Sequence, residues 1–160
     1  MMGELERLLD EEEQLLPDHQ EIIRNWDQDT TSLFGQLEAW LHDFRLKGKV
    51  LIDYDFEELN EQELGPYKVQ MRRFRFRSVP GPIDVRPRSP LVVGVRLPDG
   101  GWESGTQGRV DLSRGAIRLP LVRTATSPIH WKVGIGNQLV DLTEQSFERA
   151  LKVLLGFDSP

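Results

Sequence analysis

The spacing of apolar residues changes after Lys49 from a period of about 3.6 residues to a period of two, and this change limits the fold class. Before Lys49 the apolar residues follow helical spacing, whereas after it they alternate with polar residues, as in strands with one buried face. Strands that form one block favour an α+β fold over a parallel α/β sheet. We therefore predict an N-terminal helical hairpin or arm, a block of about five to seven antiparallel strands, and a C-terminal helix.

The first helix is expected to run from Glu4 to Leu16, because leucines recur there at helical spacing and Pro17 follows. Residues 1–16 would form an acidic N-terminal helix, and residues 17–160 a single α+β domain. The leucines exceed what a small domain needs on one short segment, so we predict that they pack against a second copy of the chain as a dimerisation arm. The predicted interface consists of Leu5, Leu8, Leu9, Leu15 and Leu16.

Two further helices carry start and stop signals. Asp18, with a glutamate three residues later, has the capping-box pattern that begins a second helix. The apolar stripe of this helix continues to Phe44, although the polar residues 29–32 can interrupt it. Thr143 as an N-cap and Gly156 as a C-terminal stop mark the last helix.

Residues 52–57 and 73–77 alternate strictly and are predicted to pair as a hairpin whose centre falls on Gly65 and Pro66. The register that matches acids with bases pairs Asp53 with Arg77, Asp55 with Arg75, and Glu57 with Arg73. Apolar residues then share the other face of the hairpin. Together with a later strand they are expected to form a core under the helix that carries Trp40, comprising Ile52, Tyr54, Phe56, Phe74, Phe76, Trp131 and Val133.

More strands are predicted at residues 91–97, 110–112, 117–121 and 129–135, with a turn at residues 98–101. Pro120 lacks the N–H that a hydrogen-bonded ladder needs. The strand at residues 117–121 is therefore expected at an edge of the sheet.

Charge is divided unequally along the chain. Residues 1–63 contain 18 Asp and Glu against 5 Lys and Arg, whereas residues 64–160 contain 8 against 15, so the net charge of −6 combines −13 with +7. Such a chain either docks its acidic half over its basic half or presents each half to a different partner, and composition alone does not separate these cases. Acidic surfaces steer basic partners, so the acidic helices are the expected docking surface.

The chain contains no cysteine, which excludes thiolate catalysis, Cys-ligated zinc and disulfides, and which fits a reducing compartment. The first residues lack the cationic start and the apolar stretch of a secretory signal. The longest apolar run, near residues 91–95, is far shorter than the roughly 18 residues that span a membrane. We expect a cytoplasmic protein with no membrane partner.

The most function-like feature is a set of arginines on predicted strands. The candidate binding residues are Arg73, Arg75, Arg77, Arg86 and Arg88. Alternate arginines on one strand lie about 6.6 to 6.8 Å apart, and such an array can hold successive phosphates or a carboxylate-rich partner. The favoured interpretation is instead a cross-strand ion-pair ladder, which neutralises the arginines and contributes roughly 0.2 to 1 kcal/mol per pair. Nucleic acid is not favoured as a partner, because the acidic half would repel phosphate.

Patterns typical of catalysis are sparse. Asp53 and Asp55 share a strand face in a way that is compatible with Mg²⁺, and residues 27–38 partly match a calcium-binding loop with Ser32 where a glycine is required. The 3 histidines show no metal-ligand spacing, and His130 is the one candidate general base. No catalytic residue, metal site or cofactor is predicted.

These observations favour a non-enzymatic intracellular protein-binding module, such as an adaptor, a chaperone or an inhibitor of a basic partner. The first alternative is binding of nucleic acid or a phosphorylated ligand through the Arg-rich strand face. The second alternative is a metal-dependent phosphoryl-transfer enzyme centred on Asp53 and Asp55.

Overall fold

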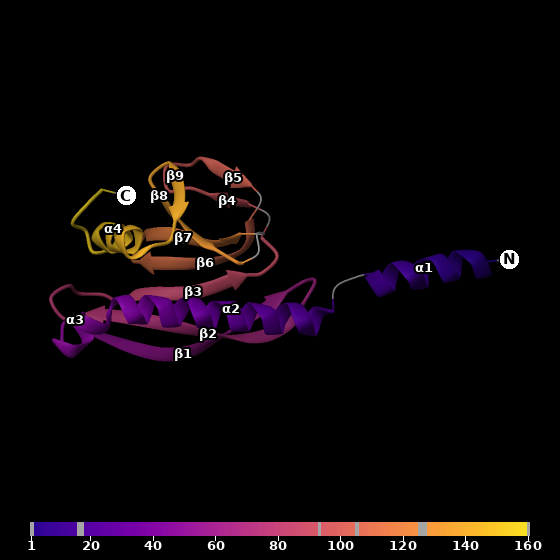
Figure 1. Cartoon of the computed structure of the whole chain (residues 1–160), viewed down its shortest axis with the longest axis horizontal. Helices are drawn as coiled ribbons and strands as arrows, with labels where there is room; N and C mark the ends of the chain where they lie inside the picture. The colour runs from indigo at the N-terminus through magenta and orange to yellow at the C-terminus, as the bar shows by residue number, and fades with distance from the viewer. Residues whose placement is uncertain (1, 16–17, 93, 105, 125–127, 160) are drawn as a thin grey trace.

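A computed structural model of the chain describes residues 2–15, 18–92, 94–104, 106–124 and 128–159. The elements in chain order are α1 (Gly3–Leu15), α2 (His19–Trp40), α3 (His42–Leu46), β1 (Val50–Glu61), β2 (Gly65–Phe76), β3 (Ile83–Ser89), β4 (Gly94–Arg96), β5 (Trp102–Ser104), β6 (Thr106–Arg114), β7 (Ile117–Thr124), β8 (Trp131–Ile135), β9 (Gln138–Asp141) and α4 (Glu144–Leu154). The predicted α+β class is confirmed (Figure 1). Among the described residues, no helix has the length and apolar character that crossing a membrane requires.

The strands form an antiparallel sheet of 7 strands in the order β1-β2-β3-β6-β7-β8-β9, and β4 pairs with β5 in a separate ribbon. The register gives the large sheet two different faces. Val85 lies opposite Leu112, which lies opposite Leu119, and all three side chains are buried on what we call the inner face. The neighbouring pair Arg86 and Asp111 points to the other side, the outer face. At these positions apolar and charged side chains therefore alternate, as in a sheet with one covered face.

Helices α2 and α4 cover the inner face and close one core (Figure 1). Trp26 and Phe34 of α2 and Phe147 and Leu154 of α4 are among its buried side chains. The Trp26 ring packs against Trp131 of β8, with 6.0 Å between the ring centroids. One apolar cluster thus joins elements from both ends of the chain, as expected for the core of a single domain.

The predicted core is confirmed in part. Ile52, Phe74 and Val133 are buried, and Phe76 and Trp131 pack against the core while partly exposed. Tyr54 and Phe56, in contrast, are 56% and 64% exposed, so their assignment to the core was wrong.

The reason for this difference is that Arg72 occupies the inner face beside Tyr54. The guanidinium of Arg72 lies 4.8 Å from the Phe34 ring centroid and 4.5 Å from the Tyr54 ring centroid, so it is held between the two rings. Its Nε also lies 3.6 Å from a carboxylate oxygen of Glu38 on α2. A cation between aromatic rings closes the core on this side. Tyr54 and Phe56 therefore remain exposed, whereas Leu59 farther along β1 packs against the core again.

The hairpin forms from the predicted segments but in a different register. Asp53 lies opposite Arg73, and Leu51 lies opposite Arg75, so the two strands are offset by four residues from the predicted pairing. The chain turns at residues 62–64, and Gly65 follows with a φ of 74°, in the left-handed region that favours glycine. An even offset keeps each side chain on its predicted face, because the side-chain period of a strand is two.

α2 is continuous from His19 to Trp40, so residues 29–32 do not interrupt it. The Thr30 hydroxyl is buried and donates to the carbonyl of Trp26 at 2.9 Å, which satisfies this polar group within the helix. Because residues 27–38 are helical throughout, they cannot form the loop that binds calcium in the pattern they resemble. The predicted ends of α4 are confirmed, with Thr143 and Ser146 forming a reciprocal capping box and Gly156 at a φ of 85°.

Pro120 lies in a central strand, because β7 stands between β6 and β8, and the predicted edge position is therefore wrong. The hydrogen-bonded ladder between β7 and β8 includes Leu121, which pairs with Val133, but does not extend to the adjacent Pro120. Gly134 lies beyond this end, and a Cβ atom there would come within 2.8 Å of the Pro120 ring. A proline is tolerated here because its missing N–H falls where the ladder stops and because glycine leaves room for its ring.

Candidate functional site

The outer face carries most of the predicted binding arginines, and each of these is paired with an acid. Arg73 donates to Asp84 at 2.7 Å, and Arg75 donates to Asp53 at 2.6 Å. Arg86 lies 3.3 Å from both Glu57 and Asp84. The hydrogen bond to Asp84 is the main reason that the pKa of Arg73 is raised above its usual value. These side chains form an ion-pair network across β1, β2 and β3, which supports the ladder interpretation over an open phosphate site.

The network differs from the predicted ladder in its partners. Arg75 pairs with Asp53 rather than Asp55, and Asp55 accepts the backbone N–H of Phe56 at 2.8 Å. Arg73 pairs with a residue of β3, a strand that the predicted hairpin did not include. Cross-strand charge pairs were therefore correctly expected, but their identities depend on strand neighbours that lie far apart in the sequence.

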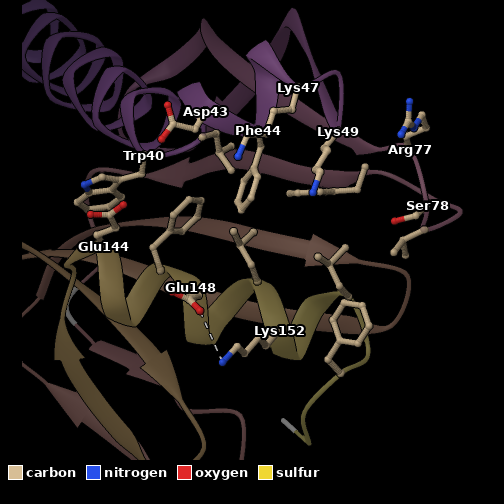
Figure 2. Close-up of a pocket in the computed structure, with 17 residues that line it drawn as sticks. Trp40, Asp43, Phe44, Lys47, Lys49, Arg77, Ser78, Glu144, Glu148 and Lys152 are labelled. Carbon is tan, nitrogen blue, oxygen red and sulfur yellow. Dashed lines mark ion pairs between the residues drawn. The ribbon is translucent and has the colours of Figure 1, made fainter.

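The remaining two candidate arginines lie outside this ion-pair network. Arg77 follows the end of β2 and lines a groove between α3 and α4 (Figure 2), and within the described part of the chain it makes no ion pair. Arg88 lies on the outer face near the buried carboxylate of Asp111. The five arginines predicted as one site are thus divided among three places.

Asp111 is the centre of a cluster that was not predicted. It is only 3% exposed, yet three guanidinium groups surround it: the Nε atoms of Arg109, Arg88 and Arg118 lie 2.6, 3.6 and 3.8 Å from its carboxylate oxygens. The cluster therefore has two more positive charges than negative ones. Arg88 and Arg118 are exposed and keep donors directed to solvent. Arg118 was missed because strand pairing, not sequence spacing, brings it to Asp111, whereas Arg109 lies two residues from Asp111 on the same strand, a spacing that could have indicated the contact.

The free edge of β1 is a second feature of interest. β1 is the first strand of the sheet, has 12 residues, and pairs only with β2 among the described residues. It contains five acids and no Lys or Arg: Asp53, Asp55, Glu57, Glu58 and Glu61. Leu51, Tyr54 and Phe56 are exposed along the same strand. A long edge strand with exposed apolar side chains is a template for pairing with another chain.

The predicted catalytic groupings do not assemble. Asp53 is paired with Arg75, Glu57 with Arg86, and Asp55 with a backbone N–H, and among the described residues no group of three or more His, Asp or Glu side chains could hold a metal ion. His130 is exposed beside a shallow cavity of about 450 Å³ that Asp141 also lines. No hydrogen bond within the described part of the chain orients its ring toward an acid, as a general base requires.

The groove of Figure 2 is the larger cavity, with a volume of about 740 Å³. Its floor is apolar and comes from α2, α3, the end of β2 and α4, with Trp40, Phe44, Phe76, Phe147, Leu151 and Leu155. One end of the groove is basic and is lined by Lys47, Lys49 and Arg77, whereas Asp43 and Glu144 line the other end (Figure 2).

α1 projects away from the rest of the molecule (Figure 1). Leu5, Leu8 and Leu9 of the predicted dimer interface are 49%, 45% and 56% exposed on this helix. Leu16 lies outside the described residues, and so does the side chain of Leu15. The interface remains a prediction, and the exposed leucines are consistent with it.

Comparison with known proteins finds no matching family model, no matching curated protein and no matching solved structure.

Proposed function

We propose that this protein is a non-enzymatic, intracellular protein-binding module that takes up a basic, extended segment of a partner along the free edge of β1. The observation that carries the proposal is that β1 is an edge strand of 12 residues with exposed aromatic side chains and no base. Backbone hydrogen bonds along a sheet edge supply affinity, and alternate side chains supply specificity. The acids of β1 select for positive charge.

The hydrogen bond at Phe56 supports this use of the edge. The Phe56 N–H donates to the Asp55 carboxylate at 2.8 Å instead of joining the ladder with β2, so this donor faces the free edge. A carbonyl of an incoming strand can replace the carboxylate there. Asp55 is then released to pair with a basic side chain of the partner.

The test uses two short synthetic peptides, one with alternating Val and Lys and one with alternating Val and Glu. We expect the Val-Lys peptide to bind and to shift the backbone amide resonances of Ile52, Tyr54 and Phe56, and the Val-Glu peptide to leave them unchanged. Reversing charge with Asp55→Lys and Glu58→Lys should weaken the binding at least about tenfold, which corresponds to about 1.4 kcal/mol.

Glu63→Lys is the matched control, because Glu63 lies in the turn and not on β1. It changes net charge by the same amount per site and should have a much smaller effect. Equal weakening by the control and the β1 variants would show that overall charge, not the β1 edge, governs binding. Binding of the Val-Glu peptide as tightly as the Val-Lys peptide would contradict the proposal outright.

The Asp111 cluster supports a second candidate function, binding of a phosphorylated or nucleic-acid ligand. Three arginines around one buried acid leave two unbalanced positive charges, and Arg88 and Arg118 have donors facing solvent. Single-stranded DNA and polyphosphate are suitable probes, because phosphate contacts give binding that weakens steeply with salt. Arg118→Glu should abolish such binding, whereas Arg75→Glu, in the paired part of the outer face, should reduce it only slightly.

A further inference from the structure

The groove between α3 and α4 has the properties of a binding site for an amphipathic helix. Its floor is formed by aromatic and aliphatic side chains, and its volume is about 740 Å³. Phe44 and Phe157 both line the groove and are exposed, although both are large and apolar. An uncovered apolar groove of this kind binds the apolar face of a helix through residues spaced three and four apart.

α1 has the complementary properties. Leu5, Leu8 and Leu9 lie on one side of the helix and are exposed. The helix also carries six acids and one base: Glu4, Glu6, Asp10, Glu11, Glu12 and Glu13, with Arg7. An isolated amphipathic helix of 13 residues is marginally stable in water, so α1 gains stability when its leucines are covered.

The charges match as well. The acidic run from Asp10 to Glu13 complements the basic end of the groove, where Lys47, Lys49 and Arg77 project (Figure 2). Asp43 and Glu144 lie at the other end of the groove. This arrangement favours one direction of the helix in the groove, with its C-terminal half toward Lys49.

α1 cannot enter the groove of its own chain. Only residues 16 and 17 separate α1 from Asp18, so the end of α1 lies within about 11 Å of the start of α2. The groove is at the opposite end of α2, about 33 Å away for a helix of 22 residues. α1 is about 20 Å long, so its leucines would fall short even if it folded back along α2. The occupant must therefore come from another molecule.

We infer that two copies of this chain exchange their α1 helices, so that the leucines of each α1 fill the groove between α3 and α4 of the other copy. If the two α2 helices lie antiparallel about a two-fold axis, the start of each α2 comes near the groove end of the other. Both contacts then form at once, and the assembly closes as a dimer instead of growing into a filament. The exchange involves neither the β1 edge nor a basic partner, so it stands independently of the proposed function.

The first experiment measures the mass of the full chain by light scattering and analytical ultracentrifugation over a range of concentrations. We expect a dimer, and a monomer after deletion of residues 1–16. Phe44→Glu places a charge on the groove floor and should weaken dimerisation at least about tenfold. Leu46→Glu is the matched control on the same helix, because Leu46 is exposed and does not line the groove. It should leave the dimer intact.

Complementation distinguishes helix exchange from a symmetric contact. Leu8→Glu damages α1 but keeps the groove, and Phe44→Glu damages the groove but keeps α1. Neither variant should dimerise alone. Their mixture retains one intact helix and one intact groove and should form a heterodimer detectable by native mass spectrometry.

Circular dichroism shows whether each variant is folded before its mass is interpreted. Lys49→Glu is a milder second groove variant, and its dimer should weaken further at low salt, where charge repulsion is screened less. A full-length chain that is monomeric at all concentrations would overturn the inference. So would a dimer that survives deletion of residues 1–16. Failure of the two folded variants to form a heterodimer, while each is monomeric alone, would likewise rule out the exchange.

Discussion

Gly108 lies in β6 at the bulge where Trp26 packs against the backbone. Its φ is 130°, and a Cβ atom there would come within 2.6 Å of the Trp26 ring. We expect Gly108→Ala to lower the free energy of unfolding by about 2 to 4 kcal/mol, because it combines an unfavourable backbone conformation with overpacking of a buried ring. Urea unfolding followed by Trp fluorescence measures this change.

Gly115→Ala is the matched control for this prediction. Gly115 also has a positive φ, of 58°, but no atom lies within 4 Å of the position its Cβ would take. It should cost only about 1 kcal/mol, from backbone conformation alone. Equal losses at Gly108 and Gly115 would mean that the contact with Trp26 contributes nothing.

The two tyrosines of the chain predict a loss of stability at alkaline pH. Burial and a hydrogen bond to Glu61 raise the pKa of Tyr67, and a hydrogen bond to Glu38 raises the pKa of Tyr54. A raised folded-state pKa means that the unfolded chain releases these protons first, near pH 10. The stabilisation is complete below about pH 10 and is lost as the pH rises further.

Ultraviolet absorbance of phenolate measures this titration directly. The native protein should show little phenolate at the pH where the urea-unfolded chain is half ionised. Tyr67→Phe should leave a single native titration, that of Tyr54, and should flatten the alkaline decline in stability. Native tyrosines that titrate together with those of the unfolded chain would contradict the prediction.

At the scale of elements, the β1–β2 hairpin shows what an alternating pattern can and cannot predict. The pattern placed Asp53, Arg73 and Arg75 correctly on one face, because the side-chain period of two fixes the face of each residue. It did not fix the offset between the strands. Charge pairs repeat every two residues, so several even offsets bring acids opposite bases, and the turn at residues 62–64 selects among them.

A double-mutant cycle on this hairpin tests the observed register. Arg75→Glu should lower stability, and the added substitution Asp53→Arg should recover about 0.5 kcal/mol or more, because these two side chains form a hydrogen-bonded pair. Asp55→Arg is the matched control, because Asp55 lies on the same face of β1 but contacts the backbone of Phe56. Recovery with Asp55→Arg and not with Asp53→Arg would favour the offset expected from the sequence.

At the scale of the whole molecule, the unequal charge distribution has two outcomes in the fold. Part of the acidic half docks on the basic half: Asp29 of α2 pairs with Arg123 at 2.8 Å, and Asp53 of β1 pairs with Arg75. The acids of α1 remain apart from the sheet (Figure 1). The sequence could predict attraction between the halves, but not which acids it would use, because that depends on strand order. The groove and the approach of Arg88 and Arg118 to Asp111 could not be predicted either, because they depend on contacts between elements far apart in the sequence.

The last prediction concerns the core that α2, α4 and the sheet share. Phe34 of α2 and Leu154 of α4 are fully buried and belong to one apolar cluster, although they lie far apart in the sequence. If residues 18–159 form one cooperative unit, Phe34→Ala and Leu154→Ala should both lower the stability of the same transition, by about 3 to 5 and 2 to 5 kcal/mol respectively. Leu46→Ala, at an exposed position of α3, should change it by less than about 0.5 kcal/mol. Far-ultraviolet circular dichroism and Trp fluorescence should report coincident unfolding curves for all three variants. A core that α2 and α4 share should unfold in one step, because neither helix can leave it while the other remains folded. Two separate transitions, with Leu154→Ala affecting only one of them, would therefore mean that α2 and α4 belong to separate folding units.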